Sequence, residues 1–194
     1  MSTADGRLEQ VTTAALAVFG RYGYRRTSMD LIAKAAGISR PTLYQHFSGK
    51  DDIFRVAGER VADELISAAE AAATADAPTA DRLYRALAVK LDVTAESLDA
   101  RFRRDLIAEA SALLPGLQTS MKTRHAAVIE TILSSAADLD LDLIPAHDIA
   151  VVLLDALTGI AQQDEPGDEL RRRLRQLVDL TARGLGRQDQ RKEA

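Results

Sequence analysis

The chain has no cysteine and no tryptophan, and aromatic residues make up only 4% of its 194 residues. The absence of cysteine excludes disulfides and thiolate chemistry, and it favours a cytoplasmic protein. No apolar run approaches the length needed to cross a bilayer, and the first ten residues lack the basic and apolar regions of a secretory signal. We therefore expect a cytoplasmic protein without a membrane partner.

The sequence also lacks a recognisable catalytic or metal-binding pattern. Its histidines, His46, His125 and His147, are scattered along the chain, and no nucleophile-elbow motif is present. The acidic run at 138–142 has a leucine and an isoleucine where a calcium-binding loop needs glycine and glutamate. We expect neither enzymatic activity nor a cofactor nor a metal site.

What is present is helical periodicity along almost the whole chain, which predicts the all-α fold class. The only strand-like alternation is at 138–143. A small, polar segment at 74–81, which contains Pro78, is typical of a connector between a small helical head and a larger helical body. After an N-terminal helix, the predicted helices are 28–36, 40–46, 51–73, 81–95, 98–114, 117–136, 146–163 and 168–186.

Two of these predicted helices, 28–36 and 40–46, are short and are separated by a turn of about three residues, which is the helix-turn-helix arrangement. The local signals are two capping boxes, a glycine suited to positive φ and a capping serine: Thr27 with Asp30, Ser48 with Asp51, Gly37 and Ser39. Four apolar residues can form the seam between the two helices: Ile32, Ile38, Leu43 and Phe47.

Charge is distributed unevenly along the chain. The net charge is −4, but residues 1–50 carry seven Lys or Arg and only three Asp or Glu. The local net charge is therefore +4, which leaves −8 for the remainder. A basic N-terminal module on an acidic body is typical of a phosphate-binding domain, although chance clustering of surface charge gives the same pattern.

The outward face of helix 40–46 carries hydrogen-bonding side chains. Arg40, Thr42 and Gln45 can pair with base edges in a major groove, and Pro41 can contact a thymine methyl group. We expect phosphate contacts from the side chains around them: Thr27, Ser28, Tyr44, His46 and Lys50. A generic helical corner with a polar outer face is the alternative.

Residues 19–53 closely resemble the N-terminal signature of the TetR family of bacterial one-component repressors. The matching positions are Phe19, Gly23, Thr27, Ile32, Ala33, Ala36, Gly37, Ser39, Thr42, Leu43, Tyr44, His46, Phe47, Lys50 and Ile53. Pro41 stands where many members have glycine, which can alter the base preference.

The resemblance covers about the first quarter of the chain. It implies a three-helix DNA-binding head, a connecting fourth helix, and a body that binds an inducer and dimerises through its last two long helices. The predicted boundaries are 1–50 for the helix-turn-helix domain, 51–75 for the connecting helix, and 76–194 for the ligand-binding and dimerisation domain.

Apolar stripes in the last two predicted helices support such a dimer. A spacing of four, three and four residues occurs in both helices and suits a bundle shared between two chains. The predicted interface residues are Ile149, Leu153, Ala156, Ile160, Leu170, Leu174, Leu177 and Thr181. Packing inside one monomer is the alternative, but paired heads would match a two-fold operator, so we favour the homodimer.

The predicted ligand pocket rests on fewer signals. Only two aromatic residues follow the connector, so an aliphatic or acyl ligand fits better than a flat cationic drug. His125 lies on an apolar stripe, where a hydrogen-bonded core histidine is the more usual outcome. The candidate pocket residues are Tyr84, Phe102, Leu106, Met121, His125, Val128 and Leu153.

These patterns together predict a ligand-responsive, DNA-binding transcriptional regulator. We expect a homodimeric repressor that binds a palindromic double-stranded operator and is released when a small-molecule inducer shifts helix 51–73. The alternative is a helical dimeric protein-interaction scaffold that does not bind DNA.

Overall fold

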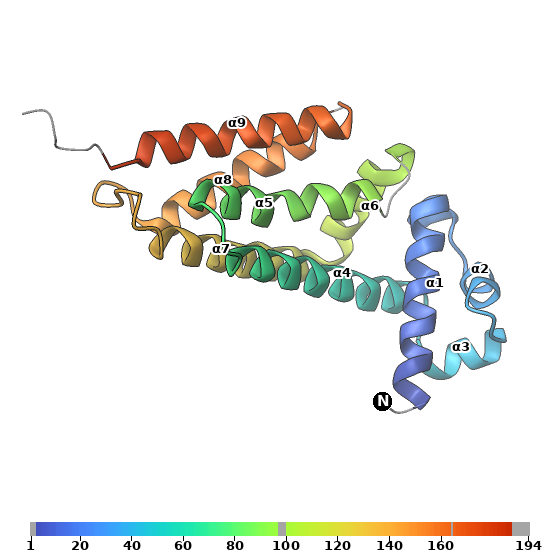
Figure 1. Cartoon of the computed structure of the whole chain (residues 1–194). Coiled ribbons are helices and arrows are strands. Elements are labelled where there is room, and N and C mark those ends of the chain that lie inside the picture. Colours follow the sequence, from blue (N-terminus) through green and yellow to red (C-terminus); the bar gives the residue numbers. More distant parts are fainter. Residues whose placement is uncertain (1–2, 97–99, 164, 188–194) are drawn as a thin grey trace, which may run out of the picture. The chain divides into compact units, whose positions relative to one another are not determined.

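The computed structural model describes residues 3–96, 100–163 and 165–187, with side chains from 6–92, 106–163 and 165–187. Within these ranges the chain forms nine α-helices and no β-strand, which confirms the all-α prediction (Figure 1). The helices are α1 (Thr3–Arg26), α2 (Met29–Ala35), α3 (Arg40–His46), α4 (Lys50–Ala73), α5 (Thr79–Glu96), α6 (Ala100–Leu113), α7 (Pro115–Ser134), α8 (Ala146–Ala161) and α9 (Gly167–Leu185). No helix in the described ranges is long and apolar enough to span a membrane.

The chain packs as two compact units, which we call the head unit and the body unit. The head unit combines residues 1–64 with 93–120, and the body unit combines residues 65–92 with 121–194. The helices α4, α5 and α7 therefore contribute residues to both units. The functional boundaries near residues 50 and 75 stay a prediction, because compactness alone does not test them.

A single apolar core holds the head unit together. Helices α1, α2, α3, α4 and α6 all contribute buried side chains to it. The buried rings of Phe19 and Phe54 pack against each other and against the partly buried ring of Tyr24. Gly23 breaks the regular helix within α1 with φ 75° and ψ 164°, a conformation that favours glycine.

The helix-turn-helix forms where the local signals predicted it. Gly37 has φ 66° and follows α2; the Ile38 amide donates to the Ala33 carbonyl (3.0 Å) and the Gly37 amide to the Lys34 carbonyl (3.2 Å). These two bonds are the Schellman pattern, which needs a left-handed residue at this point. Ser39 caps α3 by accepting the Thr42 amide at 3.2 Å. The seam residues Ile32, Leu43 and Phe47 are buried, and Ile38 is partly buried.

Both predicted capping boxes are wrong in their partners. The cap of α2 is Ser28, whose hydroxyl accepts the Leu31 amide at 3.3 Å, because the Thr27 hydroxyl instead donates backwards to the Gly23 carbonyl at 2.7 Å. At the start of α4, Ser48 pairs with Asp52 rather than with Asp51. The Asp52 carboxylate accepts both the amide and the hydroxyl of Ser48, at 3.1 and 3.3 Å.

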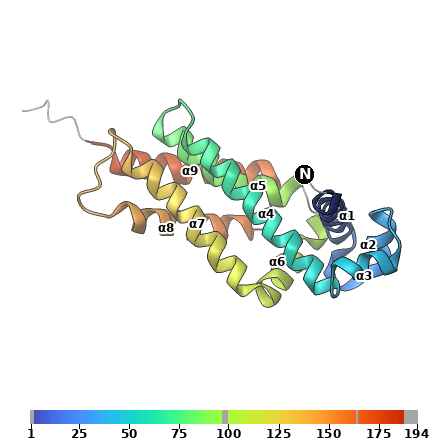
Figure 2. The ribbon, with the colours of Figure 1, turned by 90° about the horizontal axis from the view of Figure 1, so that it is seen from below.

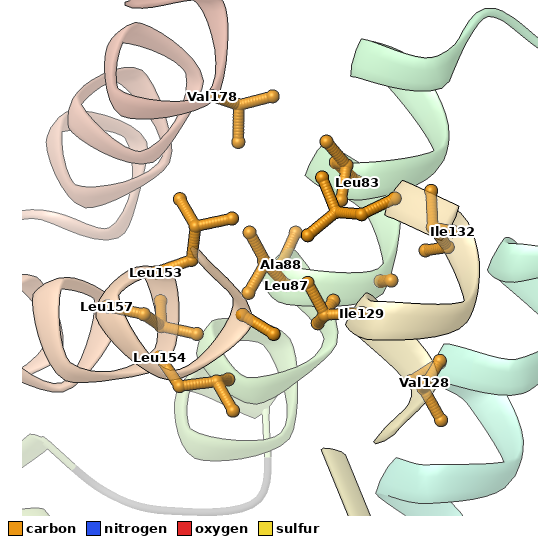
Figure 3. Close-up of a cluster of buried hydrophobic side chains, with 14 of the residues drawn as sticks. Leu83, Leu87, Ala88, Val128, Ile129, Ile132, Leu153, Leu154, Leu157 and Val178 are labelled. Atoms are coloured by element: carbon orange, nitrogen blue, oxygen red, sulfur yellow. The ribbon is translucent and has the colours of Figure 1, made fainter. Parts of the chain in front are cut away.

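The body unit has its own core, built mainly from leucine, isoleucine and alanine. Side chains from α5, α7, α8 and α9, among them Leu87, Ile129, Leu157 and Val178, point toward one another (Figure 3). Burying such side chains supplies the main stabilisation, on the order of 2 kcal/mol for each large aliphatic residue. Helices α8 and α9 run alongside each other in both views of the ribbon (Figures 1 and 2).

The strand-like alternation at 138–143 forms no strand among the described residues. Leu139 makes one isolated antiparallel bridge with Gly186, and the flanking amides of Asp140 and Arg187 donate to the carbonyls of Leu185 and Asp138. This short pairing ties the loop after α7 to the end of α9.

Candidate nucleic-acid interface

The structure leaves one face of α3 open to solvent. Leu43 is fully buried and Phe47 almost so, which fixes the inner face of the helix against the head core. The other side chains of α3 are exposed or, for Thr42, partly exposed: Arg40, Pro41, Thr42, Tyr44, Gln45 and His46. Six of the nine predicted DNA-binding residues therefore share one short outward-facing helix.

Arg40, the first residue of α3, has two neighbours on the open surface. Its Nη1 atom lies 3.1 Å from a carboxylate oxygen of Asp30 on α2, and its guanidinium carbon lies 5.5 Å from the centre of the Tyr44 ring. Tyr44 and Asp30 raise the pKa of Arg40 above its usual value, so the side chain stays cationic. Sequence reasoning assigned Asp30 only to a capping box and missed its contact with Arg40, although Asp30 is the only acidic residue between Glu9 and Asp51.

The predicted phosphate contacts at the start of α2 divide into two cases. Ser28 is exposed, and its hydroxyl already accepts the Leu31 amide. Thr27 is 3% exposed and its hydroxyl is bonded to the Gly23 carbonyl, so its side chain is a core residue rather than part of the open surface. The expected hydroxyl contact from Thr27 is therefore corrected to a structural role.

Lys50 is held by the end of α1. Its ammonium donates to the Tyr24 carbonyl at 3.0 Å and lies 4.1 Å from the centre of the Tyr24 ring. The Tyr24 hydroxyl in turn donates to the carboxylate of Asp51. Burial and this carboxylate raise the pKa of Tyr24 well above its usual value, so the phenol keeps its proton. Lys50 is thus held at the start of α4, directly after the loop that follows α3.

The predicted ligand-pocket residues are not brought together as a set. Leu106 is buried in the core of the head unit with α1 residues, so its assignment to the body pocket is wrong. The Phe102 side chain lies outside the described residues. His125 is 2% exposed and bonded to the Ala86 carbonyl at 2.9 Å, which is the core role that the sequence favoured.

The remaining predicted pocket residues lie in the body unit: Tyr84, Met121, Val128 and Leu153. Val128 and Leu153 are buried in its core, whereas Tyr84 and Met121 are partly exposed. A surface hollow in the same unit is lined by other residues, namely Ala127, Glu130, Thr131, Ser134 and Ser135. The ligand pocket therefore stays a prediction.

Half of the predicted dimer residues are covered within the single chain. Ile149, Leu153, Leu170 and Leu174 are buried in the body core, so the intramonomer alternative holds for these four. The other four are only partly buried: Ala156, Ile160, Leu177 and Thr181. Sequence reasoning missed two exposed apolar residues on the same helices, Val152 (64% exposed) and Leu180 (71% exposed).

Comparison with known proteins agrees with this geometry. Residues 11–57 match the family described as bacterial regulatory proteins, tetR family. The chain is 38% identical over 88 residues to the HTH-type transcriptional activator FasR of Mycolicibacterium smegmatis, which covers 45% of this chain and 40% of that protein. It is 35% identical over 57 residues to the HTH-type transcriptional repressor ComR of Escherichia coli, covering 29% and 27% of the two chains. These matches span less than half the length of either relative.

Solved structures extend the fold similarity to nearly the whole chain. SmeT, the repressor of a Stenotrophomonas maltophilia multidrug efflux pump, aligns with a TM-score of 0.68 at 21% identity, covering 94% of this chain and 91% of its own. A transcriptional regulator from Rhodococcus sp. aligns with a TM-score of 0.72 at 21% identity, covering 92% and 97%.

The two short helices and the exposed face of α3 define a helix-turn-helix domain of the kind found in transcriptional regulators. More specifically, residues 11–57 match the tetR family of bacterial regulatory proteins, and the fold of nearly the whole chain is similar to that of SmeT.

Proposed function

We propose that this protein is a cytoplasmic, ligand-responsive repressor that binds a palindromic DNA operator as a homodimer. The observation that carries the proposal is the open face of α3, which presents Arg40, Thr42 and Gln45 while Leu43 anchors the helix. An α-helix of this kind fits the major groove, where its N-terminal residues reach the base edges. Bound at an operator, the dimer would exclude other proteins from the same stretch of DNA.

The side chains around α3 supply the sequence-independent part of this binding. Ser28, at the start of α2, offers a hydroxyl beside the free amides of a helix N-terminus, which favours a phosphate. Tyr44 and His46 add two exposed hydrogen-bonding side chains, and the partly exposed Lys50 adds an ammonium group at the start of α4. Such contacts fix the position of the protein on the duplex and make its affinity depend on salt.

A homodimer would use the faces of α8 and α9 that the body core leaves open. Val152 and Ala156 lie one turn apart on α8, and Leu177 and Leu180 lie one turn apart on α9. Exposed apolar residues on two adjacent helices are suited to pack against the same pair in a second chain. This face replaces the predicted seam, because half of that seam is already buried within one chain.

The response to a ligand would act through the body unit. Its core is almost wholly aliphatic, which supports an apolar or acyl inducer over a flat cationic one. Helix α4 contributes residues to both units, which supports it as the segment through which ligand binding alters the head. An inducer that binds the non-DNA conformation more tightly would release the operator by population shift.

The DNA-binding part is tested by selecting a duplex from a randomised pool and measuring its affinity by fluorescence anisotropy. We expect binding that weakens steeply with salt, and Arg40→Ala should lose about 1–3 kcal/mol of discrimination against a scrambled duplex. Arg85→Ala, which removes an exposed arginine from α5, is the matched control and should leave discrimination unchanged. A wild-type protein that dimerises strongly but binds no duplex would favour the scaffold alternative.

The ligand part is tested separately by thermal unfolding with three probes: octanoate, palmitate and ethidium. We expect palmitate to raise the unfolding midpoint most, since a ligand bound to the native state stabilises it by mass action. The same compound should release the selected duplex. Stabilisation by ethidium alone would contradict the proposed apolar class of inducer.

A further inference from the structure

Arg40 is held on the surface by groups from two different helices. Its Nη1 atom lies 3.1 Å from the Asp30 carboxylate on α2, and Tyr44, one turn further along α3, places its ring 5.5 Å from the guanidinium carbon. The Arg40 and Asp30 side chains are both more than half exposed, at 55% and 65%. Because neither is buried, the core does not dictate this arrangement, and the pair is itself part of the open surface.

A carboxylate at this position works against simple affinity for DNA. Phosphates repel it, and no other acidic residue occurs between Glu9 and Asp51 to spread that repulsion. Asp30 also lies in the first turn of α2, where a negative charge stabilises the helix N-terminus. That structural role would not require contact with Arg40, so the contact calls for a separate explanation.

The geometry of the pair leaves part of the guanidinium available. Arginine has five N–H donors in a planar fork, and the contact with Asp30 engages only Nη1. The remaining edge can pair with two acceptors of one base, such as O6 and N7 of guanine. An arginine without the carboxylate could instead turn toward any phosphate, which carries no sequence information.

We propose that Asp30 is a specificity-determining residue that acts by positioning the Arg40 guanidinium toward a base edge. The inference rests on the proposed DNA-binding function. Asp30 lowers affinity for every duplex through its charge, and it lowers affinity for the wrong duplex more, because it restrains Arg40 from contacting phosphates. Removing the carboxylate should therefore increase non-specific binding and reduce discrimination together.

The test is a double-mutant cycle with Asp30→Asn, Arg40→Ala and the double variant, measured on the duplex selected by the wild type and on a scrambled duplex of the same composition. The readout is the discrimination ratio, which is the dissociation constant for the scrambled duplex divided by the dissociation constant for the selected duplex. We expect Asp30→Asn to lower this ratio roughly two- to fivefold, the range of coupling found for exposed ion pairs. In the Arg40→Ala background, Asp30→Asn should tighten binding to both duplexes and leave the ratio unchanged.

Two further variants separate positioning from charge and from helix stability. Asp30→Glu keeps the charge within reach of Arg40 and should restore most of the ratio. Asp76→Asn removes an exposed carboxylate from the segment between α4 and α5 and should leave the affinity for both duplexes unchanged. The thermal unfolding midpoint of each variant shows any loss of α2 stability, and binding is measured well below that midpoint.

The inference is overturned if Asp30→Asn changes the dissociation constants for both duplexes by the same factor, because removal of the charge alone would explain that result. It is equally overturned if the ratio falls by the same factor with and without Arg40. A loss confined to the unfolding midpoint would show a helix-stabilising role only. If the wild type binds no duplex in a salt-dependent way, the proposed function itself fails. If Arg40→Ala lowers the ratio but Asp30→Asn does not, only this inference fails and the proposed function stands.

Discussion

The Nε2 atom of His125 on α7 lies 2.9 Å from the carbonyl oxygen of Ala86 on α5, inside the core of the body unit. A carbonyl only accepts, so Nε2 carries the hydrogen and the neutral ring is satisfied on that side. Burial lowers the pKa of His125 below its usual value of 6.5, and the charge of Lys90 acts in the same direction. The hydrogen bond opposes this shift without reversing it.

The first prediction is a loss of stability in mild acid that His125 causes. An unfolded chain takes up a proton near pH 6.5 while the folded chain resists it, so the free energy of unfolding should fall as pH drops below 6.5. The slope for one site is at most about 1.4 kcal/mol per pH unit. Urea unfolding at pH 7.5 and 5.5 should show a smaller difference for His125→Gln than for the wild type. Exposed His46→Gln is the control, and an unchanged difference in His125→Gln would refute the assignment.

Gly37 gives the second prediction. It has φ 66°, and a Cβ added there would meet no atom within 4 Å, so the whole cost of Gly37→Ala is backbone strain. We expect a loss of about 1 kcal/mol in the free energy of unfolding. Gly116→Ala, at an exposed helical position that is equally open, should be neutral or slightly stabilising. Equal effects of the two substitutions would show that the turn does not need glycine.

Local signals explain why so much of the head could be predicted from sequence. The bounds of α3 depend on Ser39 and on residues within two turns of it, and the Gly37 turn depends on one residue type. The cap of α2 was placed one residue early because Thr27 and Ser28 both carry hydroxyls, and only the fold shows that Thr27 bonds back to Gly23. Both hydroxyls look equally able to cap the helix in the sequence, and only the tertiary structure determines which of them does so.

The errors in the body have a different physical cause. An apolar stripe shows which face of a helix is buried but does not show what covers it. Leu174 fits a dimer seam by its spacing and is covered by its own chain, whereas Leu180 on the same helix stays exposed. Leu106 fits a pocket by its spacing and is packed in the head core instead. The Asp30–Arg40 pair spans two helices and has no periodic signal at all.

The third prediction tests the place of α6 in the head unit. Leu106 is 5% exposed and packs in the head core, whereas the adjacent Ile107 is 36% exposed. Leu106→Ala should lower the free energy of unfolding by about 2–4 kcal/mol, since it leaves a cavity. Ile107→Ala should cost under about 1 kcal/mol. Hydrogen exchange should show that Leu106→Ala reduces protection in α1; protection lost only in the body unit would contradict this packing.

The fourth prediction concerns the proposed dimer face. Leu180 is 71% exposed in the single chain, so Leu180→Arg should leave the helical content and the fold of each chain unchanged. In a dimer, the same change would bury an unpaired charge, and such a charge costs several kcal/mol. We therefore expect light scattering after size exclusion to show a monomer, and affinity for the selected duplex to fall at least about tenfold as the paired heads separate.

Leu174→Ala is the contrasting control: Leu174 is fully buried within the chain, so its loss should lower the free energy of unfolding by about 2–5 kcal/mol. A Leu180→Arg protein that stays dimeric would place the interface elsewhere on the chain.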